Sequence, residues 1–123
     1  MDKNFINFTN HPSDKWMPMQ RKAAECYGKI VDLAFPSINP QWSSEQVDEE
    51  AQKYVALILT YHPSAVLCQG EMTFAFAVIH QLHQLHVPVL AACSKRVVRE
   101  EQTEDGATRR ISKFEFVQFR SYL

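Results

Sequence analysis

The chain has 123 residues, a formal net charge of -1 at pH 7, 46% hydrophobic residues and 22% charged residues. This length suits one domain with one core, and the charge lacks the basic excess of a general DNA-binding protein. No stretch approaches the roughly 18 apolar residues of a membrane span, and the N-terminus lacks a secretory signal pattern. We therefore expect a cytoplasmic protein that binds neither DNA nor membranes.

Strand and helix signals alternate in the first half of the chain. Pro18 suits a first helical turn and Gly28 a helix end, while Ser43 and Gln46 form the sequence pattern of a capping box. These signals predict two strands and two helices: a strand over Asn4–Thr9, a helix from Pro18 to Gly28, a strand over Lys29–Phe35, and a helix that begins after Ser43.

The next segment continues the alternation. It predicts a strand over Ser64–Gln69, a helix over Glu71–His86 and a buried strand over Val87–Cys93. This β-α-β-α-β-α-β series predicts an α/β fold: a small Rossmann-like, mostly parallel sheet with crossover helices, in one domain over residues 1–123. Because no GxGxxG motif is present, we expect no dinucleotide cofactor.

The last thirty residues change character. Arg96–Gln102 and Arg109–Tyr122 are rich in strand formers and flank Asp105-Gly106, which predicts an antiparallel hairpin over about residues 95–122. Within Phe114–Phe119 the apolar residues alternate first on even and then on odd positions, which requires a bulge or burial on both faces. A strand that is apolar on both faces needs a cover, so we expect a homodimer.

Polar residues follow three of the predicted parallel strands, whose carboxyl ends collect ligands in open α/β sheets. Amides, hydroxyls and cations at one edge suit a nucleotide-type ligand, with His11 as a candidate general acid or base. The alternative is that the same residues form turns and helix starts. The candidate residues are Asn10, His11 and Ser13; Gln69, Gly70, Glu71 and Thr73; and Ser94, Lys95 and Arg96.

Metal ligands are not expected. His80, His83 and His86 recur every third residue, so they fan around a helix instead of facing one ion. Cys26 and the strand residues Cys68 and Cys93 form no CxxC pair, and we expect reduced thiols.

Four segments together resemble small CRISPR-associated Rossmann-like proteins, the type III accessory proteins related to CARF domains and ring nucleases. The segments are Phe5–Ser13, Gln69–Phe74, Ala91–Val98 and Phe114–Arg120. The resemblance implies a dimer that binds cyclic oligoadenylate and, in some members, cleaves it without metal. Asn10, Ser13, Gln69, Glu71 and Thr73 would then contact adenosines, and Lys95 and Arg96 phosphates.

The same resemblance implies catalytic roles. His11 or Glu71 would accept the proton, and Lys95 or Arg96 would stabilise charge on the phosphate; Cys93-Ser94 beside the basic pair departs from the pattern of the group. Three alternatives stay open: a non-catalytic protein that binds or sequesters the same ligand, an enzyme like a nucleoside deoxyribosyltransferase with Glu71 as nucleophile, and an interaction module without a small ligand.

Overall fold

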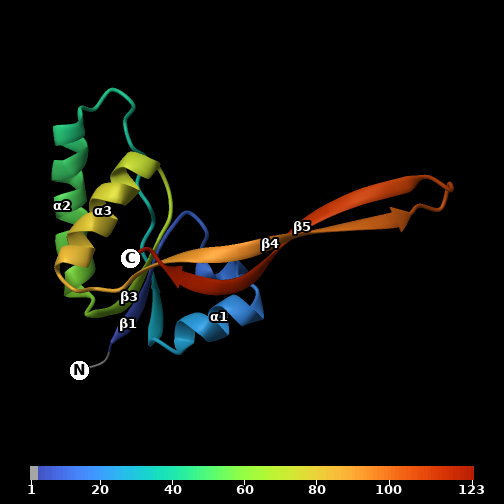
Figure 1. Cartoon of the computed structure of the whole chain (residues 1–123), viewed down its shortest axis with the longest axis horizontal. Helices are drawn as coiled ribbons and strands as arrows, with labels where there is room; N and C mark the ends of the chain where they lie inside the picture. Colours follow the sequence, from blue (N-terminus) through green and yellow to red (C-terminus); the bar gives the residue numbers. More distant parts are fainter. Residues whose placement is uncertain (1–2) are drawn as a thin grey trace.

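The computed structural model describes residues 3–123 as a mixed α/β fold around one five-stranded, mostly parallel sheet, in the order β2-β1-β3-β4-β5 (Figure 1). Strands β1 to β4 run parallel, and β5 pairs antiparallel with β4. The elements are β1 (Asn4–Phe8), a 3-10 turn (Ser13–Lys15), α1 (Pro18–Glu25), β2 (Lys29–Asp32), α2 (Ser44–Thr60), β3 (Pro63–Cys68), α3 (Met72–Gln84), β4 (Val89–Gln102) and β5 (Thr108–Ser121).

Helices cover both faces of the sheet. Alternate residues of β1 point to opposite faces, so Ile6 and Phe8 enter the larger core under α2 and α3, while Phe5 enters the smaller core under α1. Figure 1 shows α2 and α3 side by side on one face and α1 on the other. The loop after β1 therefore leaves the sheet toward one face, and the loop after the neighbouring strand β3 leaves it toward the other. In open α/β sheets, a ligand-binding crevice forms between two such loops, at the carboxyl ends of the strands.

Several local predictions are confirmed. Pro18 begins α1, and Ser43 caps α2 in a capping box: its hydroxyl accepts the Gln46 N–H, and the Gln46 side chain accepts the Ser43 N–H. The β4–β5 turn contains Gly106 at φ +83°, a conformation that favours glycine. Of the two possibilities for Phe114–Phe119, a bulge or burial on both faces, the structure has a bulge at Val117, because Cys93 pairs with Gln118 and Ser94 with Phe116.

Other boundaries were wrong. The strand expected over Lys29–Phe35 ends at Asp32, and Phe35 instead packs into the larger core from a loop. The two strands expected over Val87–Cys93 and Arg96–Gln102 are one continuous strand, β4, since β5 supplies a pairing partner from Leu90 to Gln102. Ser94 and Lys95, which lie between the two expected strands, are therefore strand residues.

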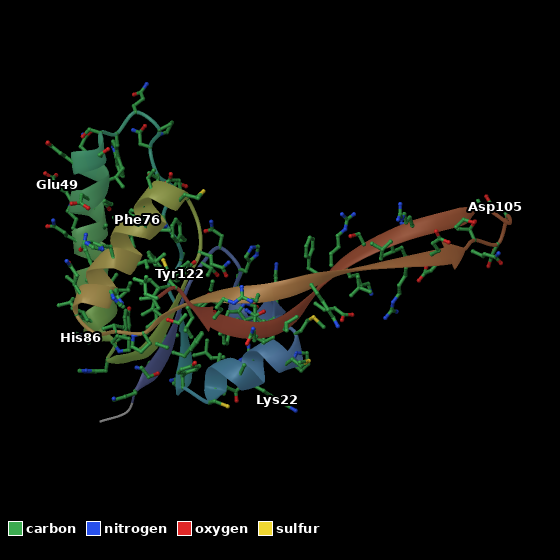
Figure 2. All side chains as sticks on the ribbon, viewed as in Figure 1. Lys22, Glu49, Phe76, His86, Asp105 and Tyr122 are labelled. Carbon is green, nitrogen blue, oxygen red and sulfur yellow. The ribbon has the colours of Figure 1, made fainter. Side chains whose placement is uncertain are left out.

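The outer part of β4 and β5 extends away from the rest of the molecule. We call residues 94–117 the arm. Figure 1 shows the arm as a twisted two-stranded ribbon, and Figure 2 places Asp105 at its far end, remote from the labelled residues of the helices. None of the helices within residues 3–123 is long and apolar enough to cross a membrane.

Candidate functional site

A pocket of about 380 Å³ lies where the arm joins the sheet. We call it the basal pocket. Four segments meet there: the loop after β1, the beginning of α1, the end of β3 and the base of the β4–β5 pair. Its lining residues include Thr9, His11, Lys15, Trp16, Met17, Gln20, Gln69, Ala92, Ser94, Phe114 and Phe116.

Hydrogen bonds from buried polar side chains fix the loop after β1. The Asn7 amide donates to the His11 carbonyl and to Asp32 Oδ1, both at 2.9 Å, and Thr9 Oγ1 donates to Asn7 Oδ1 at 2.8 Å. The indole of Trp16 donates to the same His11 carbonyl at 3.1 Å. The His11 N–H in turn donates to Thr9 Oγ1 at 3.1 Å, so three side chains hold the His11 backbone, and the exposed side chain of His11 lines the basal pocket.

Gln69 connects β3 to β4 at the point where their main-chain pairing ends. The last paired residues are Leu67 and Leu90, and beyond them Gln69 Oε1 accepts a hydrogen bond from the Ala92 N–H at 3.0 Å. The exposed side chain of Gln69 thus replaces a backbone acceptor, and this bond orients its amide at the wall of the pocket.

Aromatic side chains and one cation complete the basal pocket. Phe114 is 71% exposed, whereas Phe116 is buried and packs against Phe119 with ring centroids 4.9 Å apart. Lys15 is exposed at the pocket and supplies an ammonium group. The site therefore combines ring surfaces for stacking, hydrogen-bonding side chains and a positive charge.

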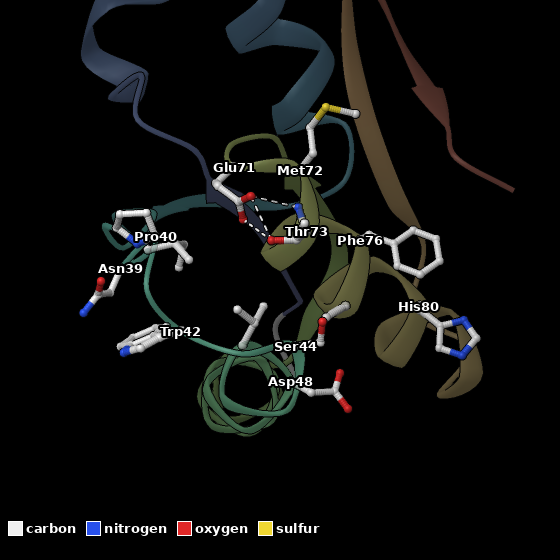
Figure 3. Close-up of a pocket in the computed structure, with 13 residues that line it drawn as sticks. Asn39, Pro40, Trp42, Ser44, Asp48, Glu71, Met72, Thr73, Phe76 and His80 are labelled. Atoms are coloured by element: carbon white, nitrogen blue, oxygen red, sulfur yellow. Dashed lines mark hydrogen bonds between the residues drawn. The ribbon is translucent and has the colours of Figure 1, made fainter.

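A second, larger cavity of about 720 Å³ lies between the N-terminal ends of α2 and α3 (Figure 3). Trp42 and the exposed Phe76 stand at this cavity, together with Glu71 and Thr73. Figure 3 shows the Glu71 carboxylate turned toward Thr73 at the beginning of α3.

Glu71 is occupied as the N-cap of α3. Its carboxylate accepts the Phe74 N–H at 2.8 Å, the Thr73 N–H at 3.1 Å and the Thr73 hydroxyl. The bonds from the Phe74 N–H and the Thr73 hydroxyl lower the pKa of Glu71. A carboxylate held in this way is a poor proton acceptor or nucleophile.

The structure thus divides the residues proposed from the sequence between different places. His11, Gln69 and Ser94 meet in the basal pocket, whereas Glu71 and Thr73 line the second cavity. Lys95 lies on the opposite face of β4 from Ser94, because successive strand residues alternate. Arg96 is on the Ser94 face, farther along the arm, and its Nε donates to Ser112 Oγ at 2.7 Å.

The three remaining candidates have other positions. Asn10 is exposed and lines neither the basal pocket nor the second cavity. Ser13 is buried, and its hydroxyl donates to Asp32 Oδ2 at 3.0 Å. Gly70 packs under Phe35, whose ring would clash with an added Cβ.

Sequence reasoning did not name several residues of the basal pocket, among them Lys15, Trp16, Phe114 and Phe116. Lys15 and Trp16 precede α1 and carried no motif. Phe114 and Phe116 were assigned to a covered strand, and only the register of β5 against β4 shows that they face Ser94 and Arg96. A buried-polar signal was present in Asn7, the amide that lies between the apolar residues Ile6 and Phe8 of β1.

No group of three or more His, Cys, Asp or Glu side chains within residues 3–123 is arranged to hold a metal ion. Fold and site together define an α/β protein with a small aromatic and polar pocket beyond the strand ends. The chain belongs to the Uncharacterized protein MJ1673 family, whose model matches residues 3–120. Comparisons with curated proteins and with solved structures give no match.

Proposed function

We propose that the basal pocket binds one nucleotide unit of a cyclic oligoadenylate, and that the protein cleaves this ring as a metal-independent ring nuclease of type III CRISPR defence. The observation that carries the proposal is the meeting of His11, Gln69 and Ser94 with Phe114 in one pocket. A volume of about 380 Å³ lies at the small end of the range for ligand pockets, roughly 300–1,000 Å³, and suits a single nucleotide.

Each chemical part of a nucleotide has a counterpart in this pocket. An adenine ring stacks on exposed aromatic side chains such as Phe114, a contact worth about 1–3 kcal/mol per base. The amide of Gln69 and the hydroxyl of Ser94 donate and accept hydrogen bonds, which suits base and ribose edges. Lys15 offers its ammonium group to a phosphate.

The strand order supports the same proposal. In the order β2-β1-β3-β4 the chain leaves the central pair β1 and β3 toward opposite faces, which is the pattern of doubly wound, Rossmann-like sheets. Ligands of such sheets bind beyond the carboxyl ends of the strands at this point. His11 and Gln69 follow these two strands.

The cleavage step needs no group beyond the ring itself and the side chains of the protein. The ribose 2′-oxygen attacks the adjacent phosphorus, the bond from phosphorus to the 5′-oxygen breaks, and a 2′,3′-cyclic phosphate and a free 5′-hydroxyl result. His11 accepts the 2′-hydroxyl proton, and the 5′-oxygen takes one proton from solvent water. His11 then returns its proton to the solvent, so the step is neutral in protons. Lys15 stabilises the additional charge on the phosphate in the transition state.

Binding is tested by titrating the full chain with cyclic tetra-adenylate and cyclic hexa-adenylate in a calorimeter. Lys15→Ala is expected to weaken binding by about tenfold or more, as for a lost charge-assisted hydrogen bond of about 1.5–3 kcal/mol. Lys95→Ala is the matched control. It also removes one positive charge, but from the face of β4 that points away from the basal pocket, so it should change the affinity less than twofold. If neither ring binds, or if both variants weaken binding equally, the assignment of the basal pocket is wrong.

Cleavage is followed separately by chromatography of the products. The wild-type protein should release linear oligoadenylates, and His11→Ala should bind the ring with little change while the linear products disappear. Binding without any linear product would instead establish the alternative function, a protein that senses or sequesters the ring.

A further inference from the structure

Apolar and charged side chains are interspersed along one face of the arm. The strand register places Arg96, Val98 and Glu100 of β4 directly opposite Phe114, Ser112 and Arg110 of β5, all on the face that also bears Ser94. Val98 is 42% exposed and Phe114 71% exposed. At roughly 3.4 Å per residue, this face continues for about 27 Å from Ser94 to Gln102.

Beyond the basal pocket, from Val98 outward, this face has no cover within the described part of the chain. The far half of the arm lies away from the helices in Figures 1 and 2. A two-stranded ribbon is only marginally stable by itself in water. Among residues 3–123 the one ion pair within 4 Å joins Lys53 to Glu50, so the charges on the arm are not paired inside the chain. Exposed apolar and charged groups in this arrangement favour an external partner.

The order of the charges identifies the partner. On β4, the positive Arg96 and the negative Glu100 lie two residues before and two residues after Val98. On β5, Arg110 and Phe114 lie two residues before and two residues after Ser112. A two-fold axis across the ribbon at the level of Val98 and Ser112 therefore brings Arg96 of one copy onto Glu100 of the other. The same axis brings Phe114 onto Arg110, a cation–π contact, and Val98 onto Val98.

We propose that two copies of the chain pair through this face of their arms, in antiparallel orientation, with Val98 at the centre of the interface. A second copy is favoured over nucleic acid because the face carries both signs of charge, whereas a phosphate backbone selects a uniformly basic surface. The tip is acidic at Glu104 and Asp105, which further disfavours a polyanion.

The pairing extends to the basal pocket. The same axis places Gln102 of one arm at the level of Ser94 of the other, and Thr108 at the level of Phe116. Each arm tip thus supplies polar groups near the mouth of the pocket of the other copy. Only this last step rests on the proposed nucleotide function; the pairing itself does not.

The first experiment measures the molar mass of ligand-free protein by light scattering after size exclusion. The wild-type chain should be a dimer, whereas Arg96→Glu and Glu100→Arg should each be monomeric, because like charges then meet twice across the axis. An equimolar mixture of these two variants should be dimeric, because both contacts then join opposite charges. A monomeric wild type, or two variants that stay monomeric when mixed although circular dichroism shows them folded, would overturn the proposal.

A second experiment locates the axis. In a Cys26→Ser, Cys93→Ser background, Val98→Cys should be linked into a covalent dimer by a short bis-maleimide reagent, because the two positions face each other across the roughly 10 Å that separates stacked sheets. Val97→Cys is the matched control: it is the neighbouring residue on the opposite face of β4 and should give less than a tenth of the linked product. Equal linking at both positions, or none at position 98, excludes this interface.

The outcomes remain separable from those of the nucleotide titrations, since neither arm experiment contains nucleotide. A dimeric protein that binds no cyclic oligoadenylate retains the arm interface and loses the proposed function. A monomeric wild type that binds the ring retains the function and loses the interface.

Discussion

The side-chain oxygen of Gln69 accepts a hydrogen bond from the backbone N–H of Ala92 at 3.0 Å, just beyond the last residues that pair β3 with β4. The bond has two consequences. It satisfies a strand N–H at the point where β4 diverges toward the arm, and it holds the amide of Gln69 in the wall of the basal pocket.

These two roles are separable by substitution. Gln69→Leu removes the acceptor and should lower the free energy of unfolding by about 1 kcal/mol, the usual net value of one such bond. Gln69→Glu keeps an acceptor for the Ala92 N–H and should unfold within about 0.5 kcal/mol of the wild type, but its negative charge should weaken nucleotide binding. Urea unfolding and calorimetry measure the two effects, and equal losses of stability in both variants would contradict the role given to this bond.

Only glycine fits at position 70, because the ring of Phe35 lies against it. An added Cβ would clash with the ring of Phe35, which is itself buried in the larger core. Gly70→Ala should therefore cost about 1–3 kcal/mol of unfolding free energy through overpacking. The measurement is again urea unfolding.

The double variant Gly70→Ala, Phe35→Leu provides the control, because a smaller side chain at position 35 removes the clash. It should be more stable than the sum of the two single losses predicts, by about 1 kcal/mol or more. Strict additivity would show that the effect at position 70 has another origin.

Much of the fold could be predicted from local signals. The cap at Ser43, the turn at Asp105-Gly106 and the broken alternation within Phe114–Phe119 each depend on a few neighbouring residues. The structure confirms the cap and the turn, and it has a bulge where the alternation breaks. The continuity of β4 could not be predicted in this way. It depends on pairing with β5, whose residues are up to 31 positions away, as for Leu90 and Ser121, so Ser94 and Lys95 were assigned to a loop.

In the candidate site too, local signals predicted some features, and others depended on residues distant in the sequence. Sequence reasoning found His11 and Gln69 because each follows an apolar strand, and the structure places both in the basal pocket. It also grouped Glu71 with them because Glu71 is close to Gln69 in the chain. Helix α3 begins in a direction that carries Glu71 to the second cavity, away from Gln69 in the basal pocket. No local sequence pattern encodes that direction.

Glu71 should make stability depend on pH. Its bonds to the Phe74 N–H and the Thr73 hydroxyl lower its pKa in the folded chain below the ordinary value of about 4.3. The folded state therefore binds this proton less readily than the unfolded state. The resulting stabilisation is fully present above about pH 5 and is lost as the pH falls through the folded pKa.

Thermal unfolding of the wild type and of Glu71→Gln, measured between pH 7 and pH 3, tests this assignment. The wild type should be the more stable at pH 7, and the difference between the two proteins should shrink as the pH falls. Asp105, whose pKa is also lowered, is present in both proteins and cancels in the comparison. A difference that stays constant across this range would show that the carboxylate of Glu71 does not act through its charge.

The three cysteines should react at different rates because their surroundings differ. Cys26 is exposed, Cys93 half-buried and Cys68 fully buried in β3, where burial raises the pKa of the Cys68 thiol to about 12. Only the thiolate is nucleophilic, so at pH 8 iodoacetamide should modify Cys26 within minutes and leave Cys68 unmodified. Peptide mass spectrometry reads the sites, and all three should react alike in 8 M urea. Modification of Cys68 in the native protein as fast as that of Cys26 would mean that β3 opens readily, which its central place between β1 and β4 argues against.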